Sequence, residues 1–255
     1  MKRIESDSNP SVKQWKKLLT RKEREKTGTF IIEGPHLVEE ALSYNADIKH
    51  LIVEENFPLP ESWDTGRIPV WQVTEKIIKT LSETEKPQGV VAVCGMTDSE
   101  NLDLSSKSKL VLIDGVQDPG NLGTIIRTAD SAGVDAVILG EGTVDVYNGK
   151  VMRSAQGSVF HIPVVKMNLK EAVESCKKSG ITVYATSLKD SSDMRDIQPA
   201  EGFALLVGNE GSGVQEAWLK EADEKLIIPI FGKAESLNVA VATGILLYEL
   251  QRTRK

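Results

Sequence analysis

The feature that most constrains the fold is a regular alternation of short apolar runs with helical segments over residues 109–255. The apolar runs contain few polar residues, which is typical of parallel strands covered by helices on both faces. The expected strands are KLVLID, DAVILG, HIPVVK, ITVYATS, FALLVG and KLIIPI. The expected helices are NLGTIIRTADSAG, VMRSAQGS, LKEAVESCKKSG, VQEAWLKEA and LNVAVATGILLYELQRTR. This part of the chain therefore predicts an α/β fold with a doubly wound parallel sheet.

The first hundred residues also alternate strands and helices. The expected strands are TFIIEG, IKHLIVEE and GVVAVCG, and the expected helical segments are PHLVEEALSY and VWQVTEKIIKTLSE. An opening helix places Val12, Trp15 and Leu19 on one face, with Asn9 or Ser11 as its N-cap.

The length of 255 residues favours two domains, with one large domain as the alternative. The stretch TDSENLDLSSKS loses the apolar period and predicts a linker. We expect a first domain at 1–97, a linker at 98–108 and a second domain at 109–255.

Charge is distributed unevenly along the chain. The total is −6, but residues 1–30 hold nine Lys and Arg against four Asp and Glu, a local balance of +5 that leaves −11 for the rest. Salt screens charges beyond about 10 Å, so a local basic patch can bind a polyanion whatever the total. The alternative is a solvated basic helix that binds nothing.

Several classes of protein are disfavoured. No run of eighteen apolar residues could span a membrane, and the N-terminus lacks the apolar core of a signal peptide. Cys94 and Cys176 lie in apolar or helical patterns and are expected to be buried free thiols, which suits the cytoplasm. With three scattered histidines, the chain offers no spaced set of metal ligands.

Parallel sheets bind ligands beyond the carboxyl ends of their strands, which directs attention to the turns after Asp114, Val207 and Ile230. In the first turn, DPGNLGTIIRTADSAG, Asn121 is suited to cap the following helix. Arg127 lies opposite the apolar arc of that helix, so it points either into water or into a cleft.

The second turn, LLVGNEGSGV, is glycine-rich but resembles no known phosphate loop. Glu210 lies where an anion would bind, which disfavours a pyrophosphate and favours a cationic or hydroxyl-rich ligand. The alternative is that the glycines only supply turn conformations and Glu210 faces water.

The third turn, IIPIFGKAESLNVAVATG, leads into a helix that is apolar on nearly every side and should be deeply buried. Ser236 and Asn238 stand at its N-terminus, where free N–H groups favour an oxygen-bearing ligand. N-capping by Ser236 would explain one of these two polar residues, but it leaves the presence of Asn238 unexplained.

These three turns, in this order, resemble the three motifs of the SpoU (TrmH) branch of the SPOUT RNA methyltransferases. The resemblance covers 109–255, and Ile230 stands where many relatives have Met. The first part, with RKEREKTGTFIIEGPHLVEEAL, looks like the small α/β, ribosomal-protein-like domain that binds substrate in such enzymes.

The resemblance implies a C-terminal SPOUT fold with a deep trefoil knot, which pattern alone would not suggest because knots are rare. It implies S-adenosylmethionine as cofactor, a ligand without phosphate that the charge of Glu210 does not oppose. The implied cofactor-binding residues are Gly208, Ile228, Leu237, Val207, Thr186 and Pro229. No metal is implied.

The implied reaction is methyl transfer to a ribose 2′-hydroxyl, around which the resemblance places catalytic residues Arg127, Asn121, Glu210, Ser236 and Asn238. That hydroxyl is a very weak acid, so the site must promote loss of its proton and stabilise the alkoxide. Guanidinium holds its proton above pH 12, so we expect Arg127 to bind an RNA phosphate or the alkoxide and not to act as a base.

The family acts as a homodimer, so Arg127 could serve the partner's site. Arg153 and Ser154 fall in a further shared region, where Arg153 either faces RNA or is an ordinary surface arginine. The expected substrate is 23S ribosomal RNA, with guanosine favoured. The alternatives are transfer RNA or a non-catalytic RNA-binding protein of the same fold. A nicotinamide-dependent oxidoreductase is disfavoured because the first strand is not followed by its glycine fingerprint.

Overall fold

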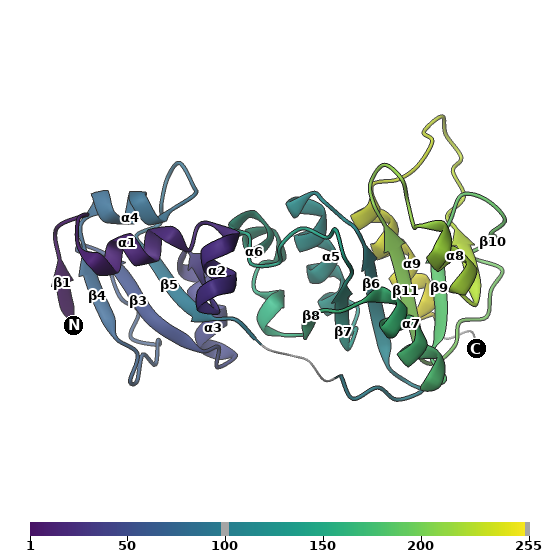
Figure 1. The fold of residues 1–255 in the computed structure, drawn as a ribbon, viewed down its shortest axis with the longest axis horizontal. Helices are drawn as coiled ribbons and strands as arrows, with labels where there is room; N and C mark the ends of the chain where they lie inside the picture. Colours follow the sequence, from purple (N-terminus) through teal and green to yellow (C-terminus); the bar gives the residue numbers. More distant parts are fainter. Residues whose placement is uncertain (98–101, 253–255) are drawn as a thin grey trace. The chain divides into compact units, whose positions relative to one another are not determined.

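The computed structural model describes residues 1–97 and 102–252, so part of the expected linker, 98–101, lies outside the described residues. The described chain forms two compact units (Figure 1). The first contains Met1–Thr97 and Tyr147–His161, and the remainder forms the second. The domain limits expected from the sequence remain a prediction, and nothing in the sequence pattern indicated that 147–161 would join the first unit.

The first unit is built on a five-stranded mixed sheet with the order β1-β4-β3-β5-β2. Its strands are β1 (Lys2–Ile4), β2 (Thr29–Glu33), β3 (Ile48–Glu54), β4 (Val70–Val73) and β5 (Val90–Gly95). Its helices are α1 (Pro10–Lys17), α2 (Arg21–Thr27), α3 (Pro35–Ser43), α4 (Glu75–Leu81) and α6 (Gly149–Ala155), with a short 3-10 turn η1 (Ser158–Phe160). β5 pairs antiparallel with β2 and β3, while β4 lies parallel to β1 and β3.

Alternate residues of these strands face two separate cores, as the two-residue period of a strand requires. Ile31 and Val91 pack on one face with residues of α1 and α4. Phe30 and Ile32 pack on the other face with α3 and with Met152 of α6. Both faces of the sheet are therefore covered, and α6 completes the second one.

The opening helix confirms most of its expected pattern. Asn9 is its N-cap, and Val12 and Trp15 are buried. Leu18, the C-cap, is also buried, while Leu19 is only half-buried because the helix has ended at Lys17. The short strands β1 and β10 and helix α2 were not expected, because they carry too few apolar residues to show a period. The expectation that VWQV belongs to the following helix is wrong, because Val70–Val73 form strand β4 and the helix begins at Glu75.

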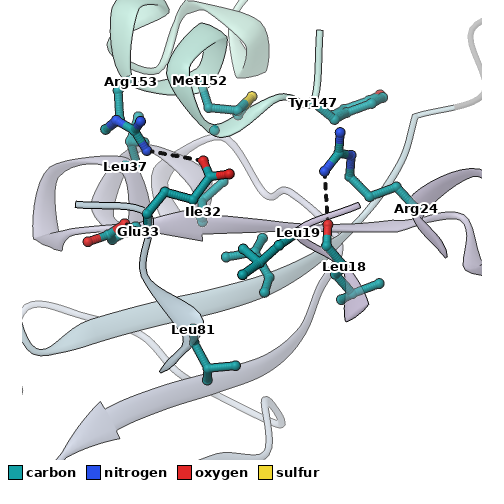
Figure 2. A pocket seen from close by; sticks show the side chains of 13 residues that line it. Leu18, Leu19, Arg24, Ile32, Glu33, Leu37, Leu81, Tyr147, Met152 and Arg153 are labelled. Atoms are coloured by element: carbon teal, nitrogen blue, oxygen red, sulfur yellow. Dashed lines mark hydrogen bonds and ion pairs between the residues drawn. The ribbon is translucent and has the colours of Figure 1, made fainter. Parts of the chain in front are cut away.

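The segment 147–161 lines part of a small pocket in the first unit. In Figure 2, Tyr147, Met152 and Arg153 lie on one side of this pocket, and Leu18 and Leu81 lie on the other. Tyr147 stacks on Phe30 with 4.3 Å between ring centroids. Arg153 forms an ion pair with Glu83 at 3.5 Å, so within this unit it is a structural contact more than a free surface charge.

The second unit contains a seven-stranded sheet, parallel throughout, with the order β10-β12-β9-β11-β6-β7-β8. Its strands are β6 (Lys109–Asp114), β7 (Ala136–Leu139), β8 (Val164–Lys166), β9 (Thr182–Thr186), β10 (Ser192–Asp193), β11 (Phe203–Gly208) and β12 (Glu224–Ile227). Its helices are α5 (Pro119–Ser131), α7 (Leu169–Lys178), α8 (Glu216–Glu221) and α9 (Val239–Leu250). The expected doubly wound parallel sheet is confirmed.

Buried aliphatic side chains on β6, β11 and β9 pack with α7, and partly buried residues of α8 join this core. Helix α9 packs against α5 and β11. The expectation that α9 is buried on nearly every side is wrong, because Val241, Ile245 and Tyr248 are 52%, 37% and 61% exposed. An apolar sequence does not distinguish a side chain in a core from one on an exposed face.

Candidate functional site

The three predicted turns meet because their strands are neighbours in the second sheet. β11 lies between β6 and β9, and β12 follows β9, so the carboxyl ends of these four strands share one edge. The chain leaves β6 toward β7 on one side, while β11 and β9 lie on the other side. This reversal of strand order is where open parallel sheets bind ligands.

The buried carboxylate of Asp114, at the end of β6, fastens the first two turns together. It accepts hydrogen bonds from the backbone N–H of Gln215 at 2.8 Å and from the Gln215 side chain at 2.6 Å. Asn209 adds a second link, because its side-chain amide donates to the carbonyl of Gly115 at 2.9 Å. The two turns thus have a fixed position relative to each other.

Helix α5 is capped by Asp118, and the expectation that Asn121 is the cap is wrong. The Asp118 side chain accepts from the backbone N–H of Asn121 at 2.9 Å, and Pro119 occupies the first helical position. An Asp followed by Pro is a recognised N-terminal signal that could have identified this cap. The side chain of Asn121 is consequently available for other contacts.

Asn121 bridges the second and third turns. Its Nδ2 donates to Glu210 Oε1 at 3.0 Å, and its Oδ1 accepts from Asn238 Nδ2 at 2.9 Å. One amide therefore connects residues that are 89 and 117 positions away along the chain. We call Glu210, Asn121 and Asn238 the amide bridge.

Glu210 is held as a carboxylate by several donors besides Asn121. The backbone N–H groups of Gln117 and Asp118 donate to its two oxygens at 3.1 and 3.0 Å. Partial burial acts to raise the pKa of Glu210, but the hydrogen bonds from Asn121 and from backbone N–H groups outweigh it and lower the pKa below its usual 4.5. Glu210 is exposed, but its carboxylate oxygens accept hydrogen bonds from three groups of the protein, so the alternative that it only faces water is wrong.

Asn238 also caps helix α9, and the expectation that Ser236 does so is wrong. The Asn238 Oδ1 accepts from the backbone N–H groups of Ala240 and Val241 at 2.9 and 3.3 Å. Its side chain therefore has two structural partners, the helix start and Asn121. Ser236 lies two residues earlier in an exposed stretch, 231–238.

Arg127 stands apart from the amide bridge. Its side chain is exposed on α5, as expected for a residue opposite the apolar arc. Among the residues that the structure describes, no hydrogen bond or ion pair joins it to Asn121, Glu210 or Asn238.

The residues expected to bind the cofactor occupy the same edge of the sheet. Val207 and Gly208 end β11 and are buried, while Thr186 ends β9, where it pairs with Leu226 of β12, and is half-buried. Half-buried Ile228 and Pro229 follow β12, and Leu237 is 37% exposed. Gly208 is required here, because a Cβ on it would lie 2.1 Å from the backbone of Gly213 and Val214.

Sequence reasoning missed the residues that hold the turns in place. Asp114, Asp118, Asn209 and Gln215 make most of these contacts, and only Asp118 carried a recognisable signal. In 1–97 and 102–252, no cluster of three His, Cys, Asp or Glu side chains could hold a metal. Within the same ranges, no helix is long and apolar enough to cross a membrane.

Comparison with known proteins identifies both parts of the chain. Residues 108–248 match the SpoU rRNA Methylase family, and residues 9–92 match the MRM3-like substrate binding domain. The 23S rRNA (guanosine(2553)-2'-O)-methyltransferase RlmP of Bacillus subtilis (strain 168) is 52% identical over 98% of this chain and 100% of its own length.

Solved structures agree along nearly the whole chain. An rRNA methyltransferase from Sinorhizobium meliloti with bound AdoMet superposes with a TM-score of 0.90 at 37% identity, covering 98% of this chain and 97% of that one. The SpoU methyltransferase AviRb from Streptomyces viridochromogenes, in complex with the cofactor AdoMet, gives 0.86 at 30% identity, covering 95% and 97%. The chain therefore belongs to the SpoU rRNA methylase family and is an S-adenosylmethionine-dependent RNA ribose 2′-O-methyltransferase.

Proposed function

We propose that this enzyme methylates the 2′-hydroxyl of a guanosine in 23S ribosomal RNA, in the cytoplasm. The proposal is supported by 52% identity to the Bacillus subtilis enzyme whose name gives that substrate, over nearly all of both chains. The observation in the structure that carries it is the amide bridge, because it joins all three motif turns at one edge of the sheet.

The residues at that edge are chemically suited to S-adenosylmethionine. Residues 208–214 include the carboxylate of Glu210 and contain no lysine or arginine. A lysine or arginine would suit a ligand with phosphate groups, whereas a carboxylate is compatible with the positively charged sulfonium. Val207, Gly208, Thr186, Ile228, Pro229 and Leu237 are proposed to hold the cofactor, largely through backbone groups. The cofactor supplies a methyl group already activated by a positively charged sulfur.

The proposed catalytic residues have different roles. The amide bridge fixes Asn238 and the helix start beside it, and Ser236 lies two residues before Asn238. Arg127 is proposed to bind the RNA phosphate or to stabilise the developing alkoxide, since a guanidinium offers several N–H donors in a planar fork that matches such oxygens. Positioning of the ribose by these groups provides the remaining acceleration.

The first unit is proposed to hold the RNA, in line with the match to a substrate-binding domain. Helices α1 and α2 expose several basic side chains, namely Lys13, Lys16, Lys17, Lys22 and Lys26. Exposed lysines on these two helices provide the sequence-independent attraction for phosphates that RNA binding requires.

A homodimer and a trefoil-knotted path belong to the same proposal. Leu237, Val241, Ile245 and Tyr248 are spaced by three or four residues, so those on α9 form one exposed apolar face. An exposed apolar face of this kind is typical of a subunit interface. Such a dimer would allow Arg127 of one subunit to serve the site of the other.

The test uses ribosomal and transfer RNA from a strain that lacks the gene, methylated in vitro with labelled S-adenosylmethionine. A 2′-O-methyl group protects its 3′ linkage from alkali, so hydrolysis should leave one labelled dinucleotide beginning with guanosine in 23S RNA. Label in transfer RNA would identify the alternative substrate. No label in either RNA, with RNA still bound, would support a non-catalytic RNA-binding protein.

A further inference from the structure

Among the described residues of the second unit, Phe231 is the most exposed large apolar side chain, at 88%. It lies four residues after the end of β12, in the stretch 231–238 that leads to Ser236 and Asn238. A single exposed apolar side chain is not unusual by itself. Phe231, however, lies in the chain segment that leads to Ser236 and Asn238, which are proposed to be catalytic, and this makes it a candidate contact for the substrate.

Arg195 lies over the ring of Phe231, with 5.8 Å between its guanidinium carbon and the ring centroid. Two atoms of the guanidinium, Nε and Nη2, donate to the two carboxylate oxygens of Asp193 at 2.9 and 2.5 Å. Asp193 belongs to β10, which pairs with β12 at Ile227. The bidentate pair therefore fixes the plane of the guanidinium beside the start of the Phe231 segment.

The titration of Asp193 agrees with this geometry. The hydrogen bonds from the Arg195 side chain and backbone lower the pKa of Asp193 to about 2. The carboxylate is thus charged throughout the physiological range, and Arg195 stays oriented.

We propose that Phe231 and Arg195 form a stacking platform for a base of the RNA strand that carries the target ribose. An aromatic ring and a planar guanidinium are the two side-chain groups on which unpaired RNA bases stack. This inference rests on the proposed RNA substrate and names residues that bind it, beyond the motif residues.

Two other occupants of Phe231 fit less well. A subunit interface would surround it with apolar neighbours, but the residues that follow are Gly232, Lys233, Ala234 and Glu235, all exposed. The adenine of the cofactor is expected against half-buried groups such as Ile228, at the strand ends, and Phe231 is far more exposed than these.

The test compares Phe231→Ala, Phe231→Trp and Arg195→Lys with the wild type. Loss of one base-stacking contact is expected to raise KM for 23S RNA about 5- to 100-fold in Phe231→Ala. Phe231→Trp should keep KM near the wild-type value, and Arg195→Lys should raise it less, because lysine keeps the charge but not the plane. The control is Leu188→Ala, which removes another exposed apolar side chain and should change nothing.

Three further measurements separate the outcomes. The Kd of S-adenosylmethionine and the sedimentation coefficient should be unchanged in Phe231→Ala; a weaker cofactor Kd or a dissociated oligomer would overturn the platform. The fluorescence of the F231W variant, minus that of the wild type, should be quenched when 23S RNA or total transfer RNA binds. If RNA binds and the fluorescence is not quenched, the platform proposal is wrong. This result does not depend on whether 23S RNA is methylated, so it tests the platform separately from the proposed function.

Discussion

The candidate site has two halves that differ in how completely the chain organises them. Glu210, Asn121 and Asn238 are joined by side-chain hydrogen bonds of 3.0 and 2.9 Å and are further bound by backbone donors from two turns. Arg127 and Ser236, by contrast, are exposed and stand outside that network. The three residues of the amide bridge are therefore positioned by one chain alone. In the function proposed above, the part of the site with Arg127 and Ser236 would be completed by the substrate or by a second subunit.

The largest effect is expected from the open half. Arg127→Ala should lower kcat by about 100- to 1,000-fold, the range expected when a donor that stabilises developing negative charge is removed from an active site. Because Arg127 is exposed, the Kd of S-adenosylmethionine and the free energy of unfolding should stay as in the wild type. Steady-state kinetics with RNA and calorimetry with the cofactor would measure both.

Arg127→Lys sharpens the interpretation of that result. If binding of a phosphate or alkoxide needs a planar guanidinium, lysine should restore little of the lost turnover. Near-full turnover of Arg127→Lys would contradict the account. If Arg127 serves the partner's site, mixing Arg127→Ala subunits with cofactor-deficient Gly208→Ala subunits should recover activity, because mixed dimers contain one complete site.

In the organised half of the site, a substitution at Gly208 should weaken both cofactor binding and stability. In Gly208→Ala the new Cβ would meet the backbone of Gly213 and Val214 at 2.1 Å, so the turn after β11 must shift. We expect at least a tenfold weaker Kd for S-adenosylmethionine and a loss of about 1–3 kcal/mol in the free energy of unfolding.

Gly211→Ala is the matched control for Gly208→Ala. Its Cβ would lie 3.6 Å from Asn209 Oδ1, an ordinary contact. Denaturant unfolding and calorimetry should therefore give values close to those of the wild type. If both variants behaved alike, the close approach at Gly208 would not be what shapes the turn.

How much of this could be foreseen from the sequence depends on the distance over which each contact acts. The strands of the second unit were predictable because a buried parallel strand is a local apolar run, as in KLVLID. The amide bridge was not, since it requires the strand order that brings Glu210 beside Asn121. The sequence identified all three members through a family resemblance, but gave Asn121 and Ser236 capping roles that Asp118 and Asn238 perform.

The same reasoning explains the other misses. The addition of 147–161 to the first unit is a long-range packing event, seen in Tyr147 against Phe30, and no local pattern encodes it. The exposed face of α9 was taken for core, because apolar residues at Val241 and Ile245 have the same local pattern in a core and on an exposed face.

A moderate effect is expected from Asn121→Asp, which tests the bridge itself. The substitution keeps the shape but replaces the donor to Glu210 by a second carboxylate, and like charges at this distance repel. We expect kcat to fall about tenfold and the pKa of Glu210 to rise. Asn168→Asp is the control, because Asn168 caps α7 by accepting from Lys170, which an aspartate does equally well.

The smallest effect concerns stability and its pH dependence at Glu210. The folded-state pKa of this carboxyl is lowered, so its charged form stabilises the fold above the usual value of 4.5, and that contribution is lost as pH falls through the lowered pKa. Glu210→Gln should therefore cost about 1 kcal/mol of unfolding free energy at pH 7, a modest figure because the carboxylate is largely exposed. Urea unfolding of both proteins between pH 7 and pH 3 should show the difference shrinking toward acid; a difference that stayed constant with pH would mean that the shape of the side chain, and not its charge, holds the three turns together.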